Sequence, residues 1–231
     1  MKSFRQSLRL AATAAKTNLL PGLLLQCLMV AFFSLYIAHE GTRNFLGEIA
    51  TVKQQTGYAF SFFSYVIAGA LLPELIRIAF FQSGKVTSQN VWLFVTAAPI
   101  WGFLGMAIDL FYRFQTVWFG TGHDFLTLLC KVLVDQMLFS PLFGIPVVVA
   151  WFLLRDEGFR PSAWKKIFCS SFILEKVFPV QVAGWCVWIP GVTLVYFMPL
   201  LLQLPVAVLI QVFWALMFTT MEEKLRRRAS V

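Results

Sequence analysis

The residues best able to do chemistry in this chain are charged side chains that interrupt long apolar runs. Three pairs stand out, and their members are three or four residues apart: Glu74 with Arg77, Asp109 with Arg113, and Lys131 with Asp135. At that spacing two side chains share one face of a helix, so each pair can neutralise itself. A lone charge at the centre of a membrane helix costs about 2.5–3.5 kcal/mol on insertion scales, so such groups pair or face protein or water.

The stretch KVLVDQ is the sharpest case, because eighteen uncharged residues, Met137 to Leu154, follow it almost at once. We expect Lys131 and Asp135 to form a pair that faces the interior of a helix bundle, with Asp109 of the preceding span nearby. Exchanging either member alone should lower folded yield, and exchanging both should restore it, because a buried charge without its partner is costly. The full candidate polar interior is Glu74, Arg77, Asp109, Lys131, Asp135, Gln136 and Gln203.

Two interpretations of these residues remain open. In the first, each pair only holds helices together, since interhelical hydrogen bonds contribute about 0.6–2 kcal/mol each. In the second, several clusters converge on one water-filled cavity that admits a solute. The sequence does not show whether the clusters meet.

The composition identifies the surroundings of these groups. Of 231 residues, 59% are hydrophobic and 13% are charged, whereas a soluble domain has about 25% charged residues. This balance predicts an integral membrane protein whose main partner is the lipid bilayer. The net charge of +8 could suggest nucleic acid, but the distribution of basic residues described below accounts for it.

We predict an all-α, polytopic bundle of about six transmembrane helices, several of them kinked by proline, over residues 19–221. The expected spans are Leu19–His39, Tyr58–Phe81, Val91–Tyr112, Phe125–Leu154, Val177–Met198 and Gln203–Met221. The last two form one uncharged run of about 67 Å if helical, which is twice the hydrocarbon core, so the chain must turn back, and Pro199 and Pro205 mark the turn. Residues 40–57 are mildly polar and predict a loop or a short surface helix.

Basic residues are distributed unequally between the two faces that these spans define. Of 19 Lys and Arg, 14 fall in segments of one face, 3 (Arg43, Lys53 and Arg113) fall on the other, and 2 lie within spans. By the positive-inside rule both termini lie on the inner side. Residues 1–18 form a basic amphipathic segment, read either as a transit peptide or as an inner surface helix, and residues 222–231 form a basic tail that anchors the chain.

The residue patterns that metal binding or catalysis would need are missing from the sequence. The four cysteines have no CxxC or metal-ligand spacing and read as small hydrophobes, and the two histidines stand alone. No phosphate-binding glycine loop or nucleophile elbow is present. We therefore expect no metal, no cofactor and no enzyme activity, and an intramembrane enzyme is the weakest alternative.

Four short motifs in order give the chain a resemblance to a known family. They are Pro99 with Asp109 ten residues on; Lys131, Asp135, Gln136 and Pro141; Trp185, Trp188 and Pro190; and Pro199 with Trp214 fifteen residues on. In this order and spacing the chain resembles the Mpv-seventeen and peroxisomal membrane protein family over residues 99–221. It departs from the family pattern at Leu110, Gly184, Ile189, Gln203 and Ala215.

The resemblance implies an inner-membrane or peroxisomal-membrane protein, and some members of that family are proposed channels for small solutes. It implies neither an enzyme activity nor a cofactor, and the departures favour a bacterial inner membrane over a mitochondrial one. The leading hypothesis is therefore a multi-pass protein that passes or binds small solutes. The alternative is a structural or adaptor membrane protein whose polar groups only hold helices together.

Overall fold

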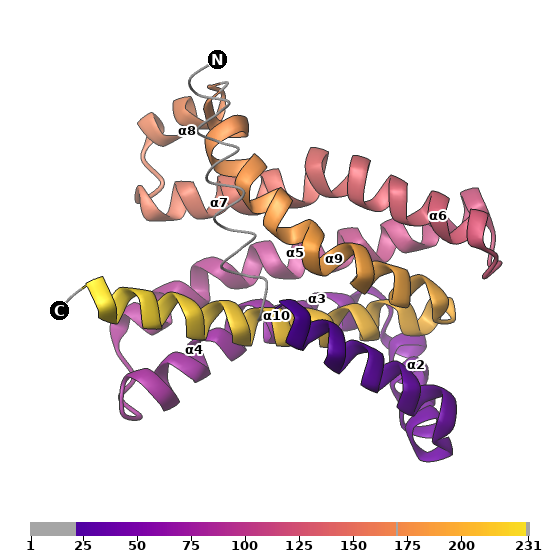
Figure 1. Ribbon diagram of the computed structural model, residues 1–231. Coiled ribbons are helices and arrows are strands. Elements are labelled where there is room, and N and C mark those ends of the chain that lie inside the picture. Colours follow the sequence, from indigo (N-terminus) through magenta and orange to yellow (C-terminus); the bar gives the residue numbers. More distant parts are fainter. Residues whose placement is uncertain (1–21, 170, 230–231) are drawn as a thin grey trace. The chain divides into compact units, whose positions relative to one another are not determined.

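The computed structural model describes residues 22–169 and 171–229, with side chains up to residue 215, and every regular element in that part of the chain is a helix (Figure 1). The first helix is Gly22–Ala38. The elements that follow are α2 (Glu40–Thr56), α3 (Tyr58–Val66), η1 (Ile67–Leu71), α4 (Leu72–Ile76), η2 (Arg77–Phe81), α5 (Ser88–Phe119), α6 (Phe125–Val134), η3 (Asp135–Gly144), α7 (Ile145–Asp156), α8 (Pro161–Ile167), η4 (Phe172–Val177), α9 (Phe178–Phe197) and α10 (Leu200–Ala229).

Four of the continuous helices are long and apolar enough to cross a membrane. They are Tyr58–Phe81, Ser88–Phe119, Phe125–Asp156 and Phe172–Phe197. The first has the predicted bounds, and the others extend the predicted spans at one or both ends. The all-helical membrane fold is thus confirmed for the middle of the chain.

The described part of the predicted first span, Leu19–His39, is the continuous helix Gly22–Ala38, and the chain bends at its predicted end. Gly22–Ala38 and α2 are long and apolar enough for a span only when taken together, and they meet at an angle of 99°. The His39 ring accepts a hydrogen bond from the Thr42 amide and caps α2, while the Arg43 guanidinium donates to the Ile37 carbonyl at 2.6 Å. Both ends exposed by the break are therefore satisfied. The sequence predicts either a loop or a short surface helix for residues 40–57, and in the structure this segment is the helix α2.

The six-span count is not reached by the described residues, which contain four such helices, or five if the bent pair is one span. The side chains of α10 are described over Leu200–Ala215, the helix continues to Ala229, and the sequence stays uncharged up to Met221, so the sixth predicted span lies only partly within the described side chains. Pro199 lies in the break between α9 and α10, as predicted, and its carbonyl accepts hydrogen bonds from Leu202 and Gln203. The prediction for Pro205 was wrong, because it lies inside α10.

Some prolines change the winding of their helix from α to π, in addition to any change in the direction of the helix axis. A proline inside a helix has no N–H and its ring clashes with the carbonyl four residues earlier. For Pro73, Pro141 and Pro179 the residue four positions earlier lies in η1, η3 and η4 respectively, and all three are π-helical segments. The wider π turn accommodates the ring there. Pro99, Pro190 and Pro205 lie in stretches that stay α-helical.

The chain divides into two compact units. One comprises residues 1–30 and 122–197, and the other comprises residues 31–121 and 198–231. In the second unit α3 and α5 pack closely because of glycine: a Cβ on Gly105 would lie 2.3 Å from the Ser61 carbonyl oxygen, and one on Gly102 would meet the Phe62 ring at 2.2 Å. Small residues permit such close approach of membrane helices.

In the first unit α9 packs on α6 and η3. The Trp185 indole N–H donates to the Gln136 carbonyl at 2.9 Å, and Gln26 of the first helix donates to the Cys186 carbonyl at 2.7 Å. Both bonds tie α9 to other segments of its own unit.

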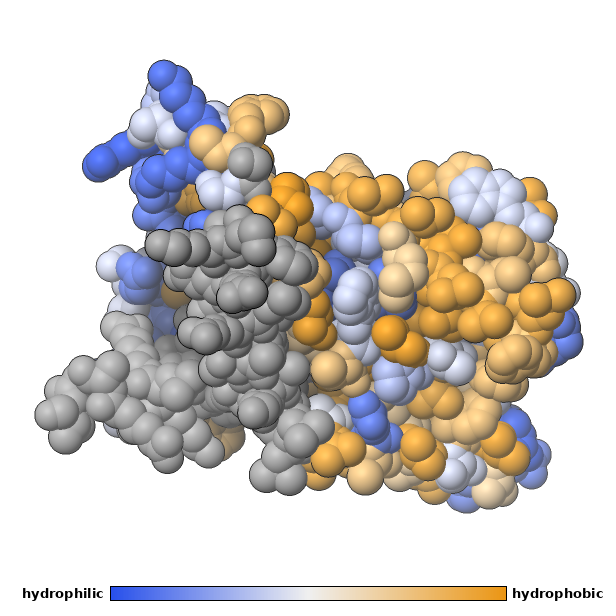
Figure 2. Space-filling model, turned by 45° about the horizontal axis from the view of Figure 1, so that its top comes forward, coloured by the Kyte–Doolittle hydropathy of each residue, from blue (hydrophilic) through white to orange (hydrophobic). Residues whose placement is uncertain are grey.

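Large apolar side chains cover much of the surface, and Figure 2 shows hydrophobic residues spread over the face drawn. Among the most exposed are Phe80, Val117, Phe125, Leu142 and Phe168. Extensive exposed apolar area marks a membrane contact. Cys27, Cys169 and Cys186 are exposed free thiols and Cys130 is a half-buried free thiol, so three of the four lie on the surface and not in a core.

Candidate functional site

The first buried polar cluster surrounds Asp109 of α5. Its carboxylate accepts from the Lys53 ammonium of α2 at 2.9 Å and from the Ser61 hydroxyl of α3 at 2.7 Å. The Arg113 guanidinium lies 3.6 Å away on the same helix and is partly exposed. Asp109, Lys53 and Ser61 are each at most 1% exposed, so three helices meet at one enclosed ion pair.

This cluster corrects the sequence analysis at Lys53. The sequence predicts that Lys53 is a charge outside the spans and that Asp109 pairs with Arg113. In the structure α2 brings Lys53 into the bundle, where it is the nearer cation to Asp109. No local spacing could reveal a contact across 56 residues, because α2 is polar overall and its one buried lysine breaks no apolar run.

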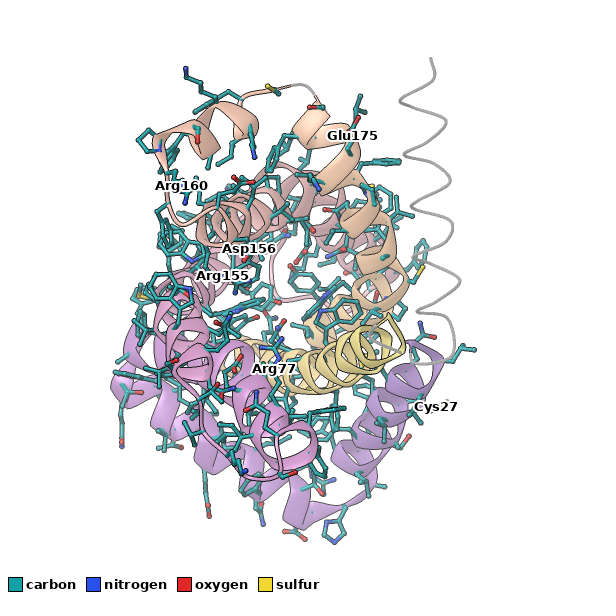
Figure 3. The ribbon with its side chains drawn as sticks, turned by 90° about the vertical axis from the view of Figure 1, so that its left-hand side faces the viewer. Cys27, Arg77, Arg155, Asp156, Arg160 and Glu175 are labelled. Atoms are coloured by element: carbon teal, nitrogen blue, oxygen red, sulfur yellow. The ribbon has the colours of Figure 1, made fainter. Side chains whose placement is uncertain are left out.

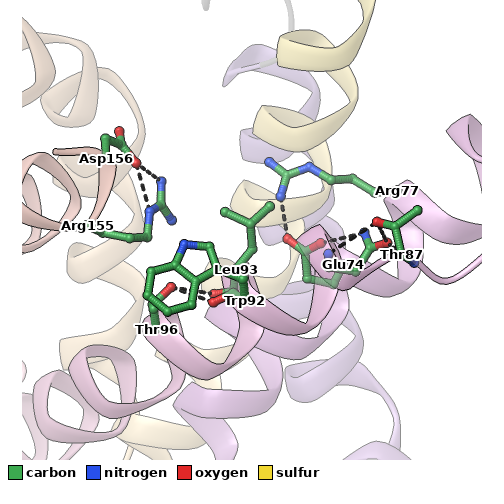
Figure 4. Close-up of polar contacts among 9 residues, drawn as sticks. Glu74, Arg77, Thr87, Trp92, Leu93, Thr96, Arg155 and Asp156 are labelled. Carbon is green, nitrogen blue, oxygen red and sulfur yellow. Dashed lines mark hydrogen bonds and ion pairs between the residues drawn. The ribbon is translucent and has the colours of Figure 1, made fainter. Parts of the chain in front are cut away.

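The second cluster joins the helix ending at Phe81 to the start of α5 (Figure 4). Glu74 and Arg77 form the predicted ion pair, and the other Glu74 oxygen accepts from the Asn90 side chain at 2.9 Å. Asn90 also completes a capping box with Thr87 at the start of α5. A threonine followed three residues later by a polar amide was a readable cap signal that the sequence analysis missed.

The third cluster surrounds Asp135, the first residue of η3. Its carboxylate accepts from the Tyr196 hydroxyl of α9 at 2.5 Å and from the Gln136 amide at 2.7 Å. Asp135 is 5% exposed. The Lys131 ammonium lies 5.9 Å from the centre of the Tyr196 ring.

The predicted Lys131–Asp135 ion pair was wrong. Asp135 takes both of its hydrogen bonds from neutral donors, and Lys131 and Asp135 both contact Tyr196. Winding is not the reason, because the Asp135 N–H still donates to the Lys131 carbonyl and the two residues are one α turn apart. The carboxylate instead takes its donors from α9 and from its neighbour in the chain. Tyr196 lies in an uncharged apolar run, and nothing in its sequence context indicated this role.

Several glutamine side chains have a buried oxygen atom with no hydrogen-bond partner among the described residues. Two of them belong to the predicted polar interior: Gln136, whose amide nitrogen donates to Asp135, and Gln203, whose amide nitrogen donates to the Met198 carbonyl at 3.2 Å. Another glutamine, Gln181 of α9, is satisfied by a reciprocal pair of hydrogen bonds with Ser140 of η3. Gln136 is therefore the buried amide with spare acceptor capacity beside a carboxylate.

The remaining motif residues have mainly local roles. Trp185 binds the backbone of η3 and Trp188 is half-buried on the same helix, Pro99 is exposed, and Pro141, Pro190 and Trp214 are half-buried. Asp109, Glu74, Arg77 and Gln203 belong to one unit, and Lys131, Asp135 and Gln136 belong to the other. Convergence of all seven on one cavity stays a prediction.

A polar hairpin follows the span Phe125–Asp156 (Figure 3). Arg155 and Asp156 form an ion pair at 2.8 Å where α7 ends, and Lys166 of α8 donates to the Glu157 carboxylate at 2.5 Å. The hydrogen bond and the positive charge of Lys166 hold the pKa of Glu157 below its usual value. Both pairs are solvated, and they order the turn between two helices.

No family model, curated protein or solved structure matches this chain. Fold and site therefore rest on the chain's own residues, and they define a multi-pass helical protein with helices that can cross a membrane and three buried polar clusters between them.

Proposed function

We propose that the protein passes or binds small solutes through the polar interior of its helix bundle. The observation that carries the proposal is Asp135, a carboxylate enclosed within a 32-residue apolar helix and held only by neutral donors. Ionisable groups inside membrane helices are rare and mark solute or ion pathways often enough to be the default hypothesis. A purely structural role would be served better by an apolar residue at this position.

The segment around Asp135 supports this function in a second way. It is π-helical for ten residues and contains Pro141, and π segments inside α-helices are frequent at functional sites. The buried, unpartnered oxygen of Gln136 adds an acceptor at the same place.

The alternative, a structural or adaptor protein without transport, is favoured by the Asp109 cluster. There every carboxylate contact is to a donor of the bundle itself, and the ion pair of Lys53 with Asp109 joins α2 to α5. Such an enclosed and satisfied pair needs no solute to explain it. We assign this cluster to holding helices together, whichever function the Asp135 cluster serves.

Osmotic swelling of liposomes distinguishes the two functions. Purified protein in liposomes is diluted into glycerol, erythritol or sorbitol, and light scattering follows solute entry. We expect entry faster than in empty liposomes for at least the smallest solute, and slower entry with Asp135→Asn than with the control Asp156→Asn at the exposed end of the same span. Rates equal to empty liposomes for all three solutes would favour the adaptor.

Location and family complete the proposal. The resemblance carried by Lys131, Asp135, Gln136 and Pro141 supports a divergent member of the Mpv-seventeen and peroxisomal membrane protein family in a bacterial inner membrane. The unequal distribution of basic residues supports termini on the inner side. Residues 1–21, which include the basic N-terminal segment, lie outside the described residues.

A further inference from the structure

The Asp135 carboxylate is held by two neutral donors and forms no ion pair with any described residue. Among the described residues its hydrogen bonds come from the Tyr196 hydroxyl, at 2.5 Å from Oδ2, and from the Gln136 amide, at 2.7 Å from Oδ1. A carboxylate offers about four lone-pair sites, and two are used here. A buried anion whose partners are all neutral is strongly disfavoured and is expected to take up a positive species.

The neighbouring amide points to which species this is. Gln136 donates through Nε2, and its Oε1 is buried without a partner. Asp135 and Gln136 therefore present unused acceptor positions next to each other, and neither carries a positive charge. A metal ion would need more oxygen ligands than these side chains supply. A single proton on the carboxyl group would neutralise its charge and give the Gln136 oxygen a donor.

We propose that Asp135, Gln136 and Tyr196 form a binding site for one exchangeable proton. A proton from water attaches to Oδ1 of Asp135 and gives a neutral carboxyl group, while the Tyr196 hydroxyl continues to donate to Oδ2. The Gln136 amide turns so that its oxygen accepts the new O–H, since the two ends of an amide exchange donor and acceptor roles on rotation. Release of the proton to water restores the arrangement in the structure.

Other charges near the site are few. The elements packed on η3 are α6, α7 and α9, and their titratable or charged side chains are Cys130, Lys131, Arg155, Asp156, Cys186 and Tyr196. Arg155 and Asp156 pair with each other at the far end of α7. Lys131 is the cation that contacts the site, through the Tyr196 ring, so the deprotonated carboxylate keeps one positive charge nearby.

Infrared spectroscopy of the protein in liposomes tests this proton site without reference to any solute. A protonated carboxyl group has a C=O stretching band distinct from that of a carboxylate. Each of the 11 acidic side chains gives such a band when protonated, so the Asp135 band is the component that is present in wild type and in Asp156→Asn and missing in Asp135→Asn. We expect this component at low pH, expect it to disappear reversibly as pH rises, and expect it to shift in D₂O because the site exchanges with water.

A second variant keeps the test decisive if Asp135→Asn does not fold. Tyr196→Phe deletes only the hydroxyl that donates to Oδ2, so the band should remain and move to higher frequency as its carbonyl loses a hydrogen bond. A band that persists in Asp135→Asn, that ignores both pH and D₂O, or that does not move in Tyr196→Phe would overturn the proton site. A titrating band in a protein without any solute flux would remove the proposed transport and leave the proton site standing.

Discussion

The Asp109 carboxylate has two positively charged partners, the buried Lys53 and the partly exposed Arg113. They differ in how much they contribute to the stability of the fold. Lys53 and Asp109 are both withdrawn from solvent, and their attraction offsets a desolvation cost that either would bear alone. Arg113 stands farther from the carboxylate, is partly exposed and also lies over the Tyr58 ring. An exposed pair of this kind contributes about 0–1 kcal/mol.

We predict that Lys53→Met or Asp109→Asn alone lowers the free energy of unfolding by about 3–5 kcal/mol, because each leaves a buried charge without its partner. The double variant should recover most of that loss. Unfolding of the purified protein in detergent, followed by circular dichroism, measures all three.

Arg113→Met is the matched control and should cost less than about 1 kcal/mol. Additive losses in the double variant, or a large loss in the control, would contradict the assignment of Lys53 as the principal partner.

The Glu157–Lys166 pair makes a prediction about pH. Because Lys166 lowers the pKa of Glu157 in the folded protein, the pair stabilises the turn above the carboxyl group's ordinary pKa. That contribution is lost as pH falls through the lowered folded value. Titration of Glu157 by NMR should give a lower midpoint in wild type than in Lys166→Met; equal midpoints would mean that the pair does not persist in solution.

Sequence reasoning at this scale succeeded where partners are close in the chain. Glu74 and Arg77 are three residues apart on one helix face and do pair. It failed for Lys53 and Tyr196, whose partners are 56 and 61 residues away. It also failed for Lys131 and Asp135, which are one α turn apart, because the spacing places two residues on one face but does not exclude a competing donor such as Tyr196.

At the scale of elements, glycine and proline determine how the helices meet. Gly105 lies one turn before Asp109 on α5, and its missing side chain lets the Ser61 backbone approach. The same approach brings the Ser61 hydroxyl to Asp109. The prolines were predicted to kink helices, but their π winding could not be foreseen, because Pro99 and Pro190 fit the same pattern and remain in α-helices.

We predict that Gly105→Ala destabilises the protein by about 1–3 kcal/mol, the usual cost of overpacking, since the new Cβ would meet backbone that cannot move away locally. Gly47→Ala on α2, where a Cβ meets nothing within 4 Å, should be neutral or slightly stabilising. Thermal unfolding in detergent compares them, and equal effects in both variants would show that α3 and α5 are not in close contact.

At the scale of the whole molecule, the structure refines which chain segments share a membrane face. The Lys53–Asp109 bond ties α2 to the last third of α5, so residues 40–57 belong on the same face as the loop after Phe119. The loop that joins Phe81 to Ser88 follows a 24-residue apolar helix and belongs on the other face. Lys53, being paired inside the bundle, no longer counts among outer-face charges, so the basic residues are distributed more unequally than the sequence alone suggested.

We predict that cysteines introduced singly at Glu48 and Thr121, with the four native cysteines replaced by alanine, are labelled from the outer side of sealed vesicles. A cysteine at Lys85 should be labelled only from the inner side, as the positive-inside rule requires. Impermeant maleimides added before and after permeabilisation measure this. Labelling of Glu48 and Thr121 from opposite sides would break the arrangement that the Lys53–Asp109 bond implies.

A fourth position, Ser230→Cys, determines whether α10 crosses the membrane. Its uncharged sequence runs from Leu200 to Met221, which is long enough for the hydrocarbon core at 1.5 Å per residue, and the helix runs on to Ala229. If α10 crosses, residue 230 lies on the inner side with Lys85, and the basic residues from Lys224 to Arg228 meet the inner surface as the charge distribution predicts. We expect this result, because the alternative leaves four basic residues on the face that otherwise has only Arg43 and Arg113. Labelling of residue 230 together with Glu48 would mean that α10 turns back within the bundle and that the protein has an odd number of spans.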